Sequence, residues 1–208
     1  MTAEEQLTEC DHVLLAFDGP VAELPSVAVA DRLRTLLAEA ELPRRVARTG
    51  DPFAVIAYAA TVGPATERAL YAHLRRVEFE LTGGARVADG LHAALATLAA
   101  AGARLTVVSG LHVDAVRSFL VMHGLDQHIR HLAARTGPGA ELPPAPDLVA
   151  AAVRDEECVF VGSTGPDLAA ARAAGVTALR YRRLVAEELD EQRNPWFAAL
   201  SSPSRRLM

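Results

Sequence analysis

The sequence predicts an α/β fold built on a parallel sheet, with a group of helices inserted after the first strand. Short apolar runs end in small or polar residues at 12–19, 104–110 and 157–163, as parallel strands buried on both faces do. Helical patterns alternate with these runs from about residue 90 onward, which favours a parallel sheet flanked by helices. The segment 22–86 breaks this alternation, because it shows helical spacing and little strand character.

The individual elements carry start and stop signals. The first run, "HVLLAFDG", ends in an aspartate and a glycine. Helices are expected over 90–102 and 112–124, each ending at a glycine that suits a helix C-terminus. Two more, over 146–156 and 165–175, begin with proline followed by aspartate, which suits a first helical turn. A last strand is expected over 176–181.

The segment 22–86 is interpreted as a helical cap inserted into the core. The core then consists of residues 1–21 and 87–208. Because ligands of open α/β sheets bind beyond the carboxyl ends of the strands, the insertion is placed to cover a binding crevice as a lid.

Composition limits the classes of function. The 208 residues are 50% apolar and 23% charged, with a formal charge of -5 and a pI near 5.8, which argues against a nucleic-acid or anionic membrane partner. All 21 basic residues are arginine, so no lysine is present to clamp a phosphate. Two cysteines without CxxC spacing, no signal peptide and no bilayer-length apolar run lead us to expect a cytoplasmic protein.

The order of the motifs resembles the haloacid dehalogenase (HAD) superfamily, in its phosphoglycolate-phosphatase-like branch with a helical cap. The pieces that carry the resemblance are "FDGP", "ADGLHAALATLAAAGARLTVVSG", "HGL", "PPAPDLV" and "VGSTGPDLAAARAAGV", spread over residues 12–183. The resemblance implies a Rossmann-like core (HAD-like) and a phosphatase that uses four motifs and Mg²⁺.

The first two motifs supply the reacting groups and a phosphate ligand. In the family, one strand-end aspartate attacks phosphorus, and a second, two residues later, acts as acid and base. The resemblance places Asp18 at the acid/base position and Ala16 at the nucleophile position. Ser109 fits the second motif, whose hydroxyl binds a phosphoryl oxygen.

Each of the last two motifs has lost one charged residue. The family's third motif is a lysine, commonly in K-P-x-P, and here Pro143 occupies the lysine position. In the fourth motif, "GSTGPD", Ser163 replaces the aspartate that holds Mg²⁺, whereas Thr164 and Asp167 match. Since Mg²⁺ requires carboxylate oxygens, Asp167 is left as a weak metal ligand and the sequence assigns no certain cofactor.

Three replacements together predict a HAD-fold protein that has lost phosphatase catalysis and acts as a binding or regulatory module. The alternative is a phosphohydrolase with residual or atypical activity on a small phosphate ester, in which Asp18 activates water.

The retained residues have structural interpretations as well. Asp18 either faces a ligand or accepts backbone hydrogen bonds in its own turn, and Ser109 and Ser163 could satisfy local donors. As ligand-binding groups, these two hydroxyls and the N–H groups of Gly19, Gly110 and Thr164 would form an anion nest for phosphate or a small phosphorylated ligand.

Two further features are weighed against simpler explanations. Arg135 is the cation nearest in sequence to the missing lysine, and a solvated loop arginine is the favoured interpretation. Trp196 and Phe197 are anchor-type residues for a protein partner, and a terminal helix packed on the sheet is favoured over that role.

Overall fold

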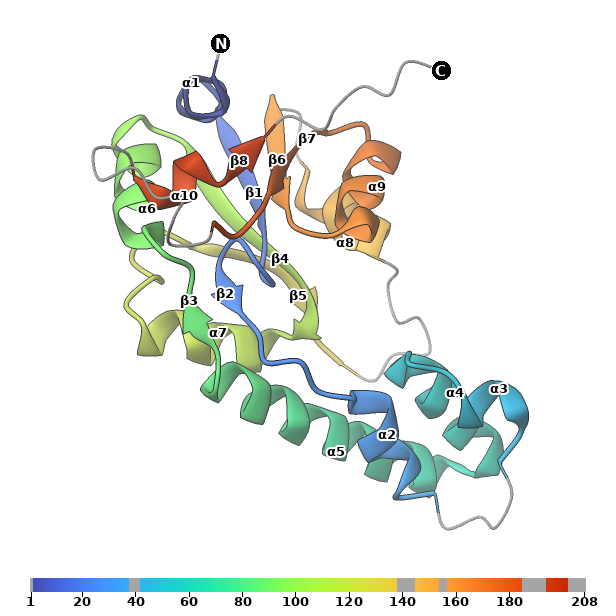
Figure 1. Cartoon of the computed structure of the whole chain (residues 1–208). Helices are drawn as coiled ribbons and strands as arrows, with labels where there is room; N and C mark the ends of the chain where they lie inside the picture. Colours follow the sequence, from blue (N-terminus) through green and yellow to red (C-terminus); the bar gives the residue numbers. More distant parts are fainter. Residues whose placement is uncertain (1, 38–41, 138–144, 154–156, 185–193, 202–208) are drawn as a thin grey trace.

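A six-stranded sheet lies at the centre of the computed structural model, which describes residues 2–37, 42–137, 145–153, 157–184 and 194–201 (Figure 1). The strand order is β5-β4-β1-β6-β7-β8. The bounds are β1 His12–Ala16, β4 Arg104–His112, β5 His131–Arg135, β6 Cys158–Gly162, β7 Thr177–Tyr181 and β8 Leu200–Ser201. Neighbouring strands pair in parallel except β7 and β8. The predicted α/β fold with a parallel sheet is confirmed.

Strand β1 lies in the middle of the sheet and is buried along its whole length. Val13 and Leu15 contribute to one apolar cluster, whereas Leu14 and Ala16 contribute to another. Side chains alternate between the two faces of a strand, so both faces of the sheet are covered. This is why β1 reads as a continuous apolar run in the sequence.

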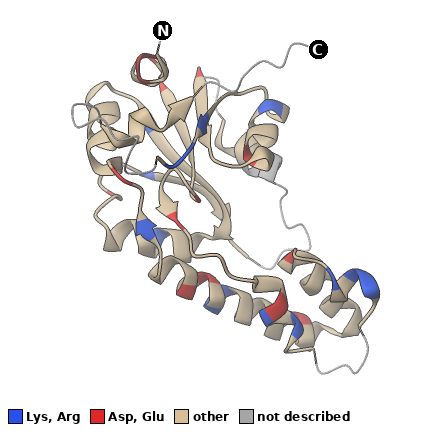
Figure 2. Ribbon diagram, in the orientation of Figure 1, with Lys and Arg blue, Asp and Glu red and all other residues tan. Residues whose placement is uncertain are grey.

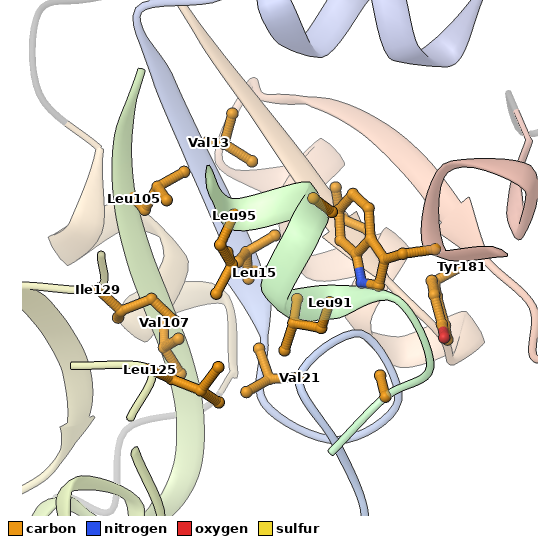
Figure 3. Packing of buried hydrophobic residues seen from close by; sticks show 14 of the residues in the cluster. Val13, Leu15, Val21, Leu91, Leu95, Leu105, Val107, Leu125, Ile129 and Tyr181 are labelled. Atoms are coloured by element: carbon orange, nitrogen blue, oxygen red, sulfur yellow. The ribbon is translucent and has the colours of Figure 1, made fainter. Parts of the chain in front are cut away.

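Helices cover both faces of the sheet. The first cluster receives side chains from α1 (Ala3–Thr8), α6 (Leu91–Ala100), α7 (Val113–Met122) and α10 (Pro195–Ala198), and Figure 3 shows Leu91 and Leu95 of α6 packed near Leu15. The second cluster receives side chains from α8 (Ala145–Ala152) and α9 (Gly165–Ala173). Both clusters are built from residues that the helical periodicity predicts to be apolar on one face.

The remaining helices lie beyond one end of the sheet (Figure 1). They are α2 (Val29–Arg34), α3 (Arg44–Ala47), α4 (Pro52–Val62) and α5 (Pro64–Gly83), and we call them the cap helices. They have an apolar cluster of their own, which includes Leu33, Val55 and Leu70. Two short strands, β2 (Ala22–Glu23) and β3 (Arg86–Val87), pair antiparallel where the chain leaves and rejoins the core. Figure 2 shows charged residues of both signs along the cap helices.

The structure contains elements that the sequence did not predict. Strand β5 is an edge strand with intermediate burial along most of its length, and its sequence, HLAAR, lacks the β-branched residues that mark a strand. Arg135 ends this strand and is only 3% exposed, so its interpretation as a solvated loop arginine is wrong. Within the described ranges, every helix is too short or too polar to cross a bilayer.

Candidate functional site

A cavity of about 310 Å³ lies between the carboxyl ends of the central strands and the cap helices. Ligands of open α/β sheets bind at this edge. The cavity walls come from the strand ends, the cap and the start of α9. The described lining residues are Ala16, Phe17, Asp18, Leu24, Val29, Pro52, Phe53, Leu74, Glu78, Leu81, Val108, Ser109, Gly110, Leu111 and Asp167.

The turn after β1 brings Ala16 and Asp18 to the cavity. Phe17 N donates to Val108 O across the sheet at 3.0 Å, and Gly19 N donates to Ala22 O at 2.8 Å, which closes the turn. Gly19 has φ +95°, and a Cβ there would lie 2.6 Å from the Cβ of Ser163. Glycine is therefore needed both for the left-handed backbone and for this close approach.

Asp18 keeps part of its surface in contact with solvent while its carboxyl group is partly buried, and its Oδ1 accepts a long hydrogen bond of 3.4 Å from Leu24 N. Loss of solvent around its carboxyl raises the pKa of Asp18, and the neighbouring charge of Asp167 raises it further, against the opposing bond from Leu24. The ionised carboxylate is therefore less well stabilised in the fold than in water. Ala16 presents only a methyl group to the same cavity.

Ser109 and Gly110 end the central part of β4 and line the cavity. Ser109 is buried, and its Oγ accepts from Leu111 N at 3.1 Å. Gly110 O accepts from Nε of Arg135 at 3.3 Å. The Ser109 hydroxyl thus satisfies a local backbone donor while it lies beside the cavity.

The polar side chains of the fourth motif form hydrogen bonds with nearby backbone groups. Ser163 Oγ donates to the carbonyl of Asp18 at 2.9 Å. Thr164 caps α9: its Oγ1 accepts from Asp167 N at 3.2 Å, while Asp167 Oδ2 accepts from Thr164 N at 3.0 Å. This reciprocal pair is a capping box. Gly19, Ser163 and Thr164 are absent from the described cavity lining, and Pro143 lies outside the described residues.

The donor set of the site does not fit Mg²⁺. Asp18 and Asp167 are the carboxylates on its strand-end side, and Asp167 is engaged in the capping box. Among the described residues, no group of three or more His, Cys, Asp or Glu side chains is arranged to hold a metal ion. Mg²⁺ prefers octahedral oxygen coordination with carboxylate ligands, which this arrangement does not supply.

A buried polar cluster closes the cap side of the cavity. Glu78 of α5 is 2% exposed and forms an ion pair with Arg135 of β5. Its Oε2 also accepts from His112 N at 3.2 Å. Arg135 donates to Tyr71 Oη and lies 5.4 Å from the Phe53 ring centroid. Burial raises the pKa of Glu78, although the Arg135 charge opposes this shift. The charge of Arg135 is thus already paired.

Sequence reasoning found the strand-end residues and missed the cap residues. The end of a buried strand can be recognised in a sequence, because an apolar run stops there at a polar residue. In contrast, Leu74 and Leu81 of α5 look like ordinary core positions on an amphipathic helix. One signal was available: Glu78 lies at helical spacing within that apolar stripe, and a charged residue there requires a partner.

Solved structures share this architecture. A predicted phosphatase from Clostridium acetobutylicum is similar with a TM-score of 0.57 at 14% identity, over 81% of this chain and 83% of that one. CbbY from Rhodobacter sphaeroides, in complex with phosphate, has a TM-score of 0.53 at 20% identity, over 81% and 84%. Protein Tyrosine Kinase A from Mycobacterium tuberculosis has a TM-score of 0.50 at 22% identity, over 81% and 82%. At these identities the likeness shows the fold.

The sequence itself also identifies the family. No curated protein matches the chain. The family profile described as haloacid dehalogenase-like hydrolase, however, matches residues 17–175, from the turn after β1 to the end of α9. This range contains the cap helices and every described residue of the cavity lining except Ala16, the last residue of β1. The chain therefore belongs to the haloacid dehalogenase-like hydrolase family.

Proposed function

We propose that this protein is a non-catalytic member of the family, which binds a small ligand in the cavity between the strand ends and the cap helices. The observation that carries this proposal is Ala16. Its methyl group lines the cavity at the position where the family resemblance places the attacking carboxylate. A methyl group has no lone pair with which to attack phosphorus, so the usual covalent step has no nucleophile there.

The surroundings of Ala16 support the same conclusion. The hydroxyl of Ser163 donates to the carbonyl of Asp18, so it satisfies the backbone where the family would use a metal-binding carboxylate. The cavity itself persists, and its volume is at the lower end of the range for small-molecule sites. A binding or regulatory role requires only this cavity and does not require the replaced catalytic groups.

The alternative is a hydrolase in which Asp18 activates water directly. It is favoured by the position of Asp18 at the cavity and by its raised pKa, since a general base works best when its pKa lies closer to the working pH. This reaction lacks a described cation in the lining to neutralise a phosphate ester.

Hydrolysis of an aryl phosphate with Mg²⁺ distinguishes the two functions. We expect the purified protein to release no phosphate above the buffer background, and the Asp18→Ala variant to behave identically. Turnover that persists through purification and disappears in Asp18→Ala would establish the hydrolase and exclude the non-catalytic proposal.

A further inference from the structure

The chemistry of the cavity walls is mostly apolar. Residues from the core and the cap line the same space, among them Leu24, Phe53, Leu74 and Leu111. Phe53 and Leu74 belong to the cap helices α4 and α5, which lie beyond the strand ends (Figure 1). Such walls favour a ligand with a hydrophobic body, because burying apolar surface drives its binding.

The charged groups of the described lining are all acidic. Asp18 and Asp167 lie at the strand-end side, and Glu78 lies at the cap side. Glu78 is compensated, because Arg135 pairs with it and both side chains are almost completely buried. The charges that remain without a basic partner in the lining are therefore those of Asp18 and Asp167.

These two carboxylates influence each other. The raised pKa of Asp18 reflects its loss of solvent and the charge of Asp167. Both carboxylates line the same cavity, and their negative charges would attract an ammonium group placed beside them.

An anion is disfavoured by the same arrangement. Two of the three N–H groups expected to form a nest are already used, since Gly19 N donates to Ala22 O and Thr164 N donates to Asp167. A phosphate would bring further negative charge next to Asp18 and Asp167 without a basic lining residue to balance it.

We propose that the cavity binds a small organic cation: an amine whose apolar body packs among the cap and core side chains and whose ammonium group faces Asp18 and Asp167. This inference rests on the proposed function, because it specifies the ligand class of the same cavity. It predicts a preference for the head group that depends on Asp18.

Three probes with an aromatic body and different head groups test the inference by calorimetry: phenethylamine (cationic), phenethyl alcohol (neutral) and phenyl phosphate (anionic). We expect phenethylamine to bind about tenfold more tightly than the alcohol, and phenyl phosphate to bind least, because a charge-assisted hydrogen bond exceeds a neutral one by this order. Asp18→Asn should weaken phenethylamine about tenfold and leave the alcohol unchanged.

Asp126→Asn is the matched control. Asp126 is exposed and lies between α7 and β5, at the amino-terminal edge of the sheet, so this variant changes the net charge equally but far from the cavity. It should bind phenethylamine like the wild type. Thermal melts of both variants verify that they are folded.

The remaining outcomes overturn the inference. If the alcohol or phenyl phosphate binds as tightly as phenethylamine, or if both variants weaken the amine equally, the cavity does not select a cation. Absence of binding by all three probes overturns it as well. None of these results affects the proposed loss of catalysis, which the hydrolysis assay tests separately.

Discussion

Ala16 and Asp18 illustrate how the meaning of a residue depends on its immediate neighbours. They are two positions apart at the end of β1, and both reach the cavity. Asp18 alone is compatible with a turn, a ligand site or an acid/base role. Beside it stand the methyl group of Ala16 and the hydroxyl of Ser163, which donates to the Asp18 carbonyl. They leave a carboxylate without the reactive partners that the family employs.

The altered acidity of Asp18 has a consequence for stability. Its pKa in the fold is raised, so the folded state holds this proton more tightly than the unfolded chain does. Protonated Asp18 therefore contributes to the free energy of unfolding. This contribution is complete below the ordinary aspartate pKa of about 3.9 and is lost as the pH rises through the raised pKa that Asp18 has in the folded state. At pH 7 the ionised Asp18 disfavours folding.

Asp18→Asn should consequently raise the thermal midpoint at pH 7, because the neutral amide resembles the protonated acid in shape and its oxygen can keep the bond from Leu24. The gain should vanish below about pH 3.9. Melting curves between pH 3 and pH 7 check this, with Asp126→Asn as a reference. A gain that is independent of pH, or a loss at pH 7, would contradict the assigned cause.

At the scale of elements, the cap is joined to the core by more than its two connecting strands. Helix α5 supplies Tyr71 and Glu78, and β5 supplies Arg135, which bonds to both. A second ion pair, between Arg75 of α5 and Asp114 of α7, measures 3.1 Å and is partly exposed. The buried pair fixes α5 over the ends of β4 and β5, which determines the shape of the cavity.

Removing one partner of the buried pair should be costly. Arg135→Met leaves the Glu78 carboxylate buried without a counter-charge, so we expect a loss of about 3–5 kcal/mol in the free energy of unfolding at pH 7. The loss should shrink at lower pH, because the unpaired Glu78 then accepts a proton. Denaturant titrations at pH 7 and pH 5 measure both effects.

The double variant Glu78→Gln with Arg135→Met is the control for this pair, since it removes both charges. It should recover part of the stability, because a neutral pair carries no uncompensated buried charge. If the single variant is as stable as the wild type, the pair does not hold α5 on the core.

The C-terminal segment is an element of the core. Trp196 and Phe197 of α10 are 0% and 1% exposed, and the indole Nε1 of Trp196 donates to Pro20 O at 2.7 Å. That bond ties the segment to the turn that follows β1. Burial of both aromatic rings agrees with the packed terminal helix favoured from the sequence.

Truncation of this aromatic anchor should destabilise the whole chain. We expect Trp196→Ala to cost about 3–5 kcal/mol, and Trp196→Phe to cost less, because it retains most of the apolar surface and loses the bond to Pro20. Chemical denaturation of both variants gives the two values. A cost below about 1 kcal/mol for Trp196→Ala would show that the segment contributes little to the core.

For the whole molecule, the order of strands and helices along the chain was predictable because the central strands are buried on both faces and are therefore mostly apolar. β1, β4 and β6 were found in this way, and the parallel topology then places Asp18, Ser109 and Ser163 at one edge of the sheet. β5 was missed because an edge strand needs no such apolar run.

The pairing of Arg135 with Glu78 was not predictable from either residue alone. The two are 57 positions apart in the sequence, and only the packing of α5 against β5 brings them together. The cap residues that line the cavity were not predictable for a related reason. In the sequence, Leu74 and Leu81 resemble ordinary core residues of an amphipathic helix, and only the structure shows that they lie beside a cavity.

The relation of this chain to its family can be tested by restoring the three lost groups together, with Ala16→Asp, Pro143→Lys and Ser163→Asp. The added carboxylates would lie near Asp18 and Asp167 and repel them, so the apo variant should be less stable than the wild type. Mg²⁺ should reverse this: at a hundredfold excess over its dissociation constant, a bound ion adds about 2.7 kcal/mol, or roughly 5–10 °C in the thermal midpoint.

The neutral counterpart, Ala16→Asn with Pro143→Met and Ser163→Asn, introduces side chains of similar size without the charges. It should show neither the Mg²⁺-dependent shift nor hydrolysis of an aryl phosphate, whereas the charged variant should show the shift and measurable turnover above the wild type. A charged variant that ignores Mg²⁺ and cleaves nothing would mean that more than these three side chains separates the cavity from a phosphatase site. Turnover dependent on the restored charges would instead place the loss of catalysis in those three side chains, because the rest of the chain is unchanged.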